Sequence, residues 1–260
     1  MSTENVSKLN QLLSLQPHGV VLQSFWLARQ GYSLDLQKRY KKSKWLESVG
    51  TGAMIRAGDQ VSYEGAIYAL QTQTVSTIHP GGRTALSLLG KAHYLELAAK
   101  SVTVFGGKGE KLPAWFQSHD WGMTISYHPS SFLPPDTGLT DVELKNFSIK
   151  VSNPARALME CLYLTPEKQQ VTECYQLMEG LNSLRPDLVQ TLLEKCESVK
   201  VKRLFMYMAE KAGHEWVQHL DMTKVDLGHG KRSIVKNGVY VAKYQITVPK
   251  ELEEHGTGSL

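Results

Sequence analysis

The sequence contains no apolar run that approaches the roughly 18 residues needed to cross a membrane. Its first ten residues lack the charged and then apolar pattern of a secretion signal. The three cysteines, Cys161, Cys174 and Cys196, are odd in number and widely spaced, which predicts neither a disulfide framework nor a metal site. We therefore expect a cytoplasmic protein without membrane contact, whose cysteines are buried as small apolar residues.

A convincing catalytic or metal-binding motif is also missing. Residues 106–111 follow a predicted strand and are rich in glycine, but they lack the spacing of a phosphate loop. His214 and His219 are five residues apart, so they miss the i, i+4 spacing of a helical zinc pair. The neighbours at positions 118–120 (Ser, His, Asp) do not indicate a catalytic triad, because triads assemble in space. The sequence therefore favours a binding protein over an enzyme, with no cofactor and no metal.

Length and composition are those of an ordinary globular protein. Hydrophobic residues make up 42% of the 260 residues and charged residues 21%. This length is comfortable for two domains. The net charge of +4 is mild, so any binding to nucleic acid must come from local clustering of basic residues.

Residues 20–60 carry the clearest pattern. An apolar helix pattern over residues 20–28 leads into a turn at residues 31–33, and a basic helix pattern follows over residues 34–46. A ribbon punctuated by glycines occupies residues 50–59. This order of helix, tight turn, basic helix and hairpin describes a winged helix-turn-helix, which places its second helix in the DNA major groove.

The turn has a local explanation. Gly31 can adopt the left-handed conformation that ends a helix, and Ser33 can cap the next helix, with Asp35 in its first turn. Three apolar residues of the second helix pattern are expected to face the core: Leu36, Tyr40 and Leu46.

The outward face of the second helix is basic. Its five cations are Lys38, Arg39, Lys41, Lys42 and Lys44. Such clustering suits phosphate contact, because neutralised phosphates release counterions. We predict that Ser33 and these cations bind DNA, with Lys38 or Arg39 reaching a guanine edge, and that Arg56 on the wing reaches the minor groove or flanking backbone. The alternative is a solvated lysine face on an ordinary surface helix, which by itself would not predict a wing.

The remaining pattern predicts an α+β fold: the winged helix-turn-helix followed by a larger mixed α/β C-terminal domain. We place the domains at residues 1–75 and 76–250, with a flexible tail at 251–260. The predicted helices cover residues 6–15, 63–70 and 83–89. Two further helices are predicted to begin after Asn153 and after Arg185, and a third carries residues 201–208. Strands are predicted at residues 75–79, 102–105, 123–127 and 147–151, an exposed loop at 130–138, and a closing hairpin around Asn237-Gly238 over residues 232–248.

A second basic patch is predicted in the C-terminal domain, where basic residues outnumber acidic ones between residues 200 and 250. Its members are Lys200, Lys202, Arg203, Lys231 and Arg232. The patch is either a further nucleic-acid contact or a solvated surface. A separate alternative is that three arginines are salt-bridge partners at the edge of the core: Arg83, Arg156 and Arg203.

Short motifs follow one another in order along nearly the whole chain. In the first part they are Gly19-Val20-Val21, Trp26-Leu27, Arg39-Tyr40, Trp45-Leu46, Glu64-Gly65-Ala66 and residues 81–86 and 89–95. In the second part they are residues 111–115, 153–158, 199–205, 227–232 and 244–249. Together they resemble the motifs of the AbiE-type antitoxins, the regulators of type IV toxin–antitoxin and abortive-infection systems of bacteria.

The resemblance implies an N-terminal winged helix that binds inverted repeats in the promoter of its own two-gene operon and represses it. It also implies a C-terminal domain that counters a nucleotidyltransferase toxin without needing a stable complex, and a role for the second basic patch in antitoxicity or extra DNA contact. Two alternatives stay open. The second domain could bind a small molecule in an apolar pocket, or it could be nuclease-like, although the carboxylate pair Asp141 and Glu143 lies in loop-like sequence.

Overall fold

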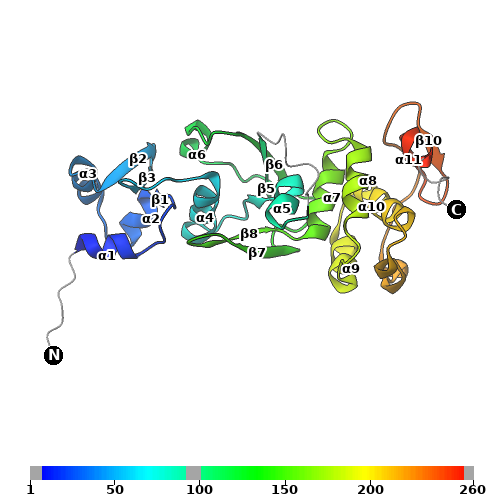
Figure 1. The fold of residues 1–260 in the computed structure, drawn as a ribbon, viewed down its shortest axis with the longest axis horizontal. Helices are drawn as coiled ribbons and strands as arrows, with labels where there is room; N and C mark the ends of the chain where they lie inside the picture. The colour runs from blue at the N-terminus through cyan, green and yellow to red at the C-terminus, as the bar shows by residue number, and fades with distance from the viewer. Residues whose placement is uncertain (1–7, 92–100, 255–260) are drawn as a thin grey trace.

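The computed structural model describes residues 8–91 and 101–254, and the molecule is elongated (Figure 1). The elements from α1 to β3 lie at one end of the long axis, and β10 and α11 lie at the other end. The mixture of helices and sheets confirms the predicted α+β class. The predicted helix start at residue 6, the motif residues 92–95 and the tail beyond residue 254 fall outside the described residues.

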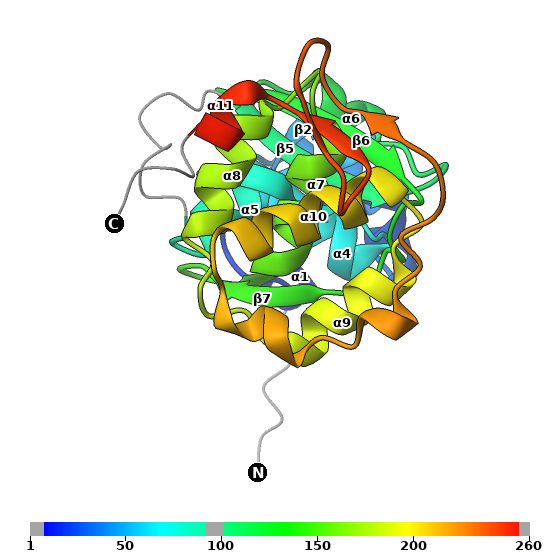
Figure 2. The ribbon, with the colours of Figure 1, turned by 90° about the vertical axis from the view of Figure 1, so that its right-hand side faces the viewer.

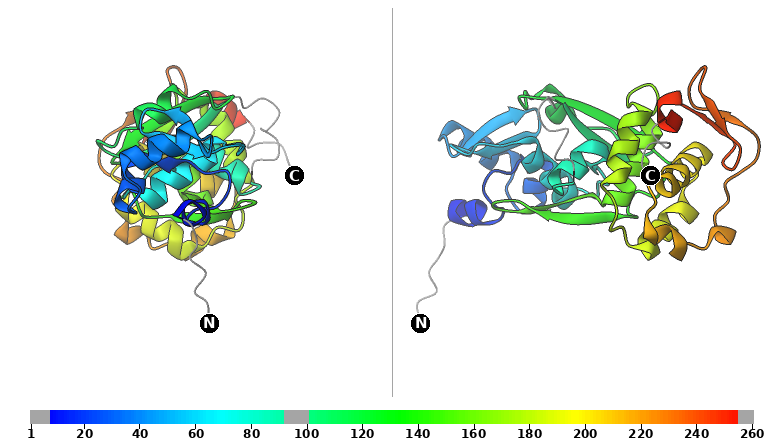
Figure 3. Two further views of the ribbon diagram at one scale, coloured as in Figure 1. Left: turned by 90° about the vertical axis from the view of Figure 1, so that its left-hand side faces the viewer. Right: turned by 45° about the vertical axis from the view of Figure 1, so that its right-hand side comes forward.

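The first end of the molecule is a winged helix-turn-helix. Its elements are α1 (Lys8–Ser14), β1 (Leu22–Gln23), α2 (Ser24–Arg29), α3 (Leu34–Lys42), β2 (Leu46–Gly50) and β3 (Ala53–Arg56). The three strands form an antiparallel sheet in the order β1-β3-β2, with Leu22 opposite Met54 and Leu46 opposite Arg56. Figure 3 shows these elements together at the end of the molecule that faces the viewer in its left panel.

The helix predicted over residues 20–28 is wrong in its first half. Residues 20–23 are all buried, and Leu22 and Gln23 pair with β3 as a short strand. A short apolar run fits a buried strand as well as a helix, so periodicity alone does not separate the two. The second helix is likewise shorter than predicted, because Leu46 belongs to β2 and not to α3.

Helix α4 (Tyr63–Gln73) joins the sheet to the rest of the chain through two buried amides. The side-chain oxygen of Gln73 accepts a hydrogen bond from the backbone nitrogen of Gln23 at 2.8 Å. Its side-chain nitrogen donates to the carbonyl of Val21 at 2.7 Å, and the side-chain nitrogen of Gln23 donates to the carbonyl of Ala69 at 3.0 Å. The edge of β1 is thereby hydrogen-bonded to α4.

The middle of the chain supplies two sheets. Its elements are β4 (His79–Pro80), α5 (Gly82–Leu88), β5 (Ser101–Gly107), α6 (Ala114–Ser118), β6 (Thr124–Ser130), β7 (Leu139–Glu143) and β8 (Ser148–Ser152). Strands β4, β5 and β6 form one sheet, with β5 and β6 parallel, and β7 and β8 form an antiparallel pair.

Three predictions for this region need correction. The strand predicted over residues 75–79 is reduced to β4, and Val75 is fully exposed. The loop at residues 130–138 is not wholly exposed, because Phe132 and Leu133 are buried. Asp141 and Glu143 lie on strand β7 and not in a loop, although both side chains are exposed to solvent.

A helical block follows and packs on these sheets. It consists of α7 (Pro154–Leu164), α8 (Val171–Glu179), α9 (Pro186–Lys195) and α10 (Val199–Lys211), followed by short 3-10 helices at Glu215–His219 and Met222–Lys224. The predicted start of α7 is confirmed, because the side chain of Asn153 accepts a hydrogen bond from the backbone nitrogen of Arg156 at 2.9 Å. The cysteines are free and buried, as predicted.

The chain continues into a small sheet of β9 (Arg232–Ser233), β10 (Val239–Val241) and β11 (Ile246–Val248), shown from its own side in Figure 2. The predicted hairpin around Asn237-Gly238 is wrong in its pairing, because β10 pairs with β11 and β9 runs parallel to β11. Asn237 does have the positive φ of a turn residue, at 56°. The sequence predicts a flexible tail from residue 251, whereas α11 (Lys250–Glu254) extends to residue 254 with Leu252 buried.

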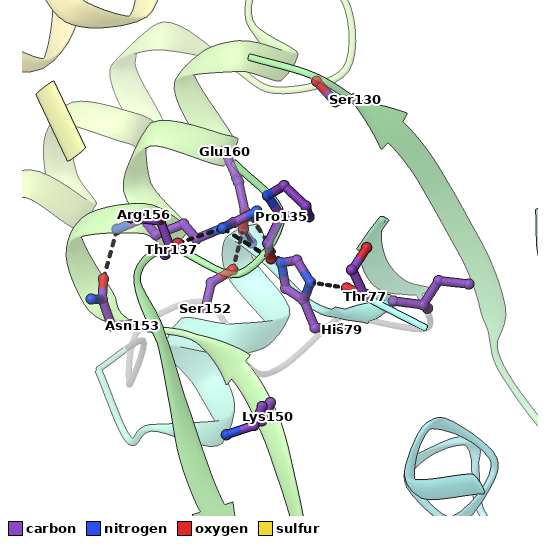
Figure 4. Close-up of polar contacts among 12 residues, drawn as sticks. Thr77, His79, Ser130, Pro135, Thr137, Lys150, Ser152, Asn153, Arg156 and Glu160 are labelled. Atoms are coloured by element: carbon purple, nitrogen blue, oxygen red, sulfur yellow. Dashed lines mark hydrogen bonds and ion pairs between the residues drawn. The ribbon is translucent and has the colours of Figure 1, made fainter. Parts of the chain in front are cut away.

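A buried polar cluster around Glu160 holds four elements of the C-terminal part together (Figure 4). One carboxylate oxygen of Glu160 accepts from Nε of Arg156 at 2.8 Å and lies 3.3 Å from Nε2 of His79. The other accepts from the backbone nitrogen of Gly82 at 2.8 Å and from Oγ of Ser152 at 2.7 Å. The cluster therefore connects β4, α5, β8 and α7.

The Glu160 carboxylate is fully buried, yet its partners keep it ionised. Burial raises its pKa, but the hydrogen bond from His79 and the positive charge of Arg156 outweigh burial and lower the pKa to about 2. Arg156 is thus the salt-bridge partner that the sequence suggested, and it also donates to the carbonyls of Pro134 and Thr137.

Candidate nucleic-acid interface

One buried side chain, that of Gln37 in α3, sets the geometry of the helix-turn-helix. Its amide nitrogen donates to the carbonyls of Ser24 at 3.0 Å and Tyr32 at 2.7 Å, and its amide oxygen accepts from the Ser24 hydroxyl at 2.6 Å. Gly31 between the helices has a φ of 87°, as the predicted left-handed turn requires. Gln37 therefore binds the start of α2 and the turn at the same time.

The predicted cap of α3 is confirmed. The Ser33 hydroxyl accepts a hydrogen bond from the backbone nitrogen of Leu36 at 3.3 Å. Asp35 lies in the first turn, where the helix dipole favours a carboxylate, and its Oδ1 lies 3.6 Å from Nζ of Lys38.

The exposed side of α3 carries the predicted cations in a defined arrangement. The side that faces the protein consists of Leu36, Gln37 and Tyr40. At about 100° of rotation per residue, Asp35, Lys38 and Lys42 form the line opposite to that side. Arg39 and Lys41 lie to either side of this line, and all four cations are exposed. The line places Lys38 and Lys42 foremost, whereas Arg39 points toward one flank.

Lys44 does not belong to α3, which ends at Lys42. It has a φ of 57°, in the left-handed conformation that glycine usually adopts at the end of a helix. The backbone nitrogen of Lys44 donates to the carbonyl of Lys41 at 3.0 Å, and that of Trp45 donates to the carbonyl of Tyr40 at 2.9 Å. Lys44 is thus an exposed cation held just beyond the basic helix.

The hairpin that follows is held against the rest of the molecule. The backbone nitrogen of Ser24 donates to the carbonyl of Gly52 at 2.8 Å, so the hairpin turn contacts the start of α2. Strand β2 also packs against α6, and a Cβ added at Gly50 would lie 2.9 Å from the Cβ of Trp115. The predicted wing is therefore a short hairpin that contacts both parts of the chain.

The placement predicted for Arg56 is wrong. Its side chain is only 6% exposed, and its guanidinium donates to the carbonyl of Gln16. Burial lowers its pKa, and the nearby carboxylate of Asp59 opposes that shift. Arg56 ends β3 on the side of the sheet that faces the loop before β1, so it is not available to a groove of DNA.

The second basic patch is not one surface. Lys202 and Arg203 are buried, at 5% and 2% exposure. Nζ of Lys200 donates to the carbonyls of Tyr163 at 2.8 Å and Thr165 at 2.6 Å. Burial lowers the pKa of Lys200. These three residues therefore serve the packing of α10.

Lys231 and Arg232 remain as exposed members, and Lys236 is exposed beside them in the sequence. Nζ of Lys231 lies 5.2 Å from the ring centroid of Tyr240. A sharper signal for this surface lies in the sequence, because residues 227–250 contain no Asp or Glu. This C-terminal basic surface (Lys231, Arg232 and Lys236) lies at the opposite end of the molecule from α3 (Figure 1).

A polar hollow of about 620 Å³ lies beside α5 and α8. Its lining includes Arg83, which forms a 3.6 Å ion pair with Glu173, and Gln169, which donates to the same carboxylate. Arg83 is thus also a salt-bridge partner, as the sequence suggested. The hollow is not the apolar pocket that would favour a small-molecule sensor. Within residues 8–91 and 101–254, no group of three His, Cys, Asp or Glu residues is arranged to hold a metal ion, and no helix is long and apolar enough to span a membrane.

A basic helix fixed behind a capped turn, beside a short hairpin, is the architecture of a winged helix-turn-helix transcriptional regulator. Family models agree with it over nearly the whole chain. Residues 5–97 match the N-terminal domain of the AbiEi antitoxin transcriptional regulators, and residues 99–249 match the transcriptional regulator, AbiEi antitoxin, of type IV toxin–antitoxin systems. The chain belongs to this AbiEi antitoxin family.

One solved structure supports the fold. The crystal structure of the RV2827C protein from Mycobacterium tuberculosis is similar to this chain with a TM-score of 0.58 and 14% sequence identity, over 91% of this chain and 89% of that protein. A search of curated proteins found no match.

Proposed function

We propose that this antitoxin is the sequence-specific repressor of its own two-gene operon and that it counters a nucleotidyltransferase toxin encoded beside it. The observation that supports the DNA-binding part is the exposed line of Lys38 and Lys42 on a helix whose orientation Gln37 fixes. Such a protein works by binding and not by catalysis, and it acts in the cytoplasm, where its promoter lies.

In this proposal the cations along α3 have different roles. Lys38 and Lys42 enter the major groove, and Arg39, Lys41 and Lys44 contact phosphates on its two sides, while the Ser33 hydroxyl is already used as the helix cap. Because inverted repeats present the same sequence twice, two copies of the protein bind one promoter. Arg56 has no part in the interface, since it is buried.

The C-terminal basic surface serves antitoxicity. It lies at the far end of the long axis from α3 (Figure 1), so one winged helix and this surface do not share a half-site on DNA. Three exposed cations and Tyr240 on an extended ribbon fit an anionic surface of a protein partner.

Fluorescence anisotropy on DNA from upstream of the gene tests the repressor. The protein is titrated against the native duplex and a scrambled duplex over a salt series. We expect Lys38→Ala/Lys42→Ala to lower affinity for the native duplex at least tenfold. The control Lys231→Ala/Lys236→Ala removes the same charge from the other end and should leave binding unchanged. Equal losses from both variants, or equal affinity for both duplexes, would contradict the proposal.

Co-expression tests antitoxicity. Cells that express the neighbouring toxin are complemented with wild-type protein or with Lys231→Ala/Arg232→Ala/Lys236→Ala. We expect the triple variant to bind the promoter normally and to fail to restore growth. Full rescue by the triple variant would show that this surface has no role in antitoxicity.

A further inference from the structure

The first turn of α3 differs in chemistry from the rest of its exposed face. Leu34, the first residue of the helix, is 59% exposed. The side chain of Asp35 is 87% exposed and is the single carboxylate of α3. The cations all follow, from Lys38 to the end of the helix. An apolar side chain and an acid thus occupy the end that a helix-turn-helix presents to base edges.

Phosphate binding does not explain these two residues. Leu34 belongs neither to the core of the winged helix nor to the apolar residues packed against it. A carboxylate among cations repels the DNA backbone, and the helix dipole would favour an acid at Asp35 whether or not DNA were bound. The base edges in the major groove present methyl groups and amino donors, which an apolar side chain and a carboxylate can contact.

The positions of the two side chains fit such a role. At about 100° per residue, Leu34 and Asp35 lie on the two sides of Lys38 at the same end of the helix. Nζ of Lys38 lies 3.6 Å from Oδ1 of Asp35. This ion pair offsets the charge of the carboxylate near the phosphates and leaves the other carboxylate oxygen free to accept a hydrogen bond.

We propose that Leu34 and Asp35 are specificity-determining residues: Leu34 contacts the methyl group of a thymine, and Asp35 accepts a hydrogen bond from the amino group of a cytosine in the same major groove. This inference rests on the proposed function, since it requires that α3 enters the groove. It assigns sequence recognition to the first turn of α3 and leaves affinity to the cations that follow.

Selection from a randomised duplex library tests the Asp35 half of the proposal. Wild-type protein, Asp35→Asn and the phosphate-contact control Lys41→Ala each select a preferred sequence, which is read by sequencing. We expect Asp35→Asn to lose a preference for cytosine of tenfold or more at one position and to accept adenine there, because an amide pairs with adenine. Lys41→Ala should bind more weakly to every sequence and select the wild-type motif.

Removal of one methyl group from the DNA tests the Leu34 half of the proposal. Each thymine of the selected motif is replaced by deoxyuridine, which lacks only the methyl group. At one position we expect wild-type protein to lose affinity severalfold, and Leu34→Ala to bind the thymine and deoxyuridine duplexes equally. Both substitutions lie on an exposed helix face, and equal thermal midpoints confirm that the variants fold.

The outcomes distinguish a failure of this inference from a failure of the proposed function. If wild-type protein selects a motif and the Asp35 and Leu34 variants select the same motif with the same thymine dependence, the inference is wrong and the repressor stands. If wild-type protein selects no motif at all, the repressor and the inference are both wrong.

Discussion

The hydroxyl of Ser24 at the start of α2 donates a 2.6 Å hydrogen bond to the side-chain oxygen of Gln37 in the middle of α3. The side-chain nitrogen of Gln37 returns two hydrogen bonds, to the carbonyls of Ser24 and Tyr32. Gln37 is only 2% exposed, so a single buried amide satisfies three polar groups and fixes the angle between the two helices. The orientation of the basic helix therefore depends on this amide.

Gln37→Leu should therefore affect both stability and DNA binding. The change keeps the volume of the side chain but removes the partner that two carbonyls and a hydroxyl share, at a cost of about 1–3 kcal/mol for each group that stays unsatisfied. We expect a lower urea midpoint and weaker promoter binding although no charge has changed. Ser24→Ala, which removes one of the three hydrogen bonds, should show a smaller effect of the same sign. Unchanged affinity in Gln37→Leu would mean that α3 is positioned by other contacts.

Lys44 lies in a conformation that costs a non-glycine residue about 1 kcal/mol. Backbone strain that persists beside a candidate interface suggests that the side chain is needed there. We predict that Lys44→Gly keeps or raises the thermal midpoint and lowers affinity for promoter DNA. Lys44→Ala removes the same charge and keeps the strain, so it should lose affinity equally without the gain in stability. If Lys44→Gly bound DNA as tightly as wild type, the lysine would have no role in binding.

Glu160→Gln should destabilise the C-terminal part by about 3 kcal/mol or more at pH 7, because Arg156 loses its buried partner. The folded pKa of Glu160 is about 2 and lies below the ordinary value of 4.5. The stability that the carboxylate contributes is thus complete above about pH 4.5 and is lost as the pH falls toward 2. Urea midpoints between pH 7 and pH 3 should fall less steeply for Glu160→Gln than for wild type. Glu143→Gln, on an exposed strand position, should follow wild type throughout.

The sequence predicted best what depends on neighbouring residues. The Ser33 cap, the Gly31 turn and the Asn153 cap each need only a few residues of chain, and the structure confirms all three. Pairing between distant segments was not predictable. Asn237-Gly238 is a strong local hairpin signal, yet β9 pairs with β11 instead of β10. Arg203, far away in the sequence, donates to the carbonyl of Leu227 before β9 and to that of Gln245 before β11. The partners of buried cations were not predictable for the same reason. The sequence predicts Arg56 in a DNA groove and Arg203 either in a basic patch or in a salt bridge at the edge of the core, whereas both donate to backbone carbonyls that no pattern reveals.

Arg203 is a buried cation that backbone carbonyls hold in place. Its guanidinium donates to the carbonyls of Leu227 at 2.7 Å, Gly228 at 2.9 Å, Gly230 at 2.6 Å and Gln245 at 3.3 Å. A planar guanidinium with five N–H groups can serve four acceptors at once, whereas a lysine ammonium is a single point with three. The segment before β9 and the turn before β11 are therefore held by one side chain.

Arg203→Lys should loosen this segment without unfolding the winged helix. Each hydrogen bond from a charged group contributes about 1.5–3 kcal/mol, so loss of two or more removes much of the local stability of residues 227–248. We expect faster amide hydrogen exchange in β10 and β11, faster proteolysis near Gly230, and promoter binding equal to wild type. Arg232→Ala, an exposed neighbour in the same segment, should leave exchange unchanged. If Arg203→Lys kept wild-type exchange in β10 and β11 and still failed to counter the toxin, Arg203 would act as a binding residue and its structural assignment would be wrong.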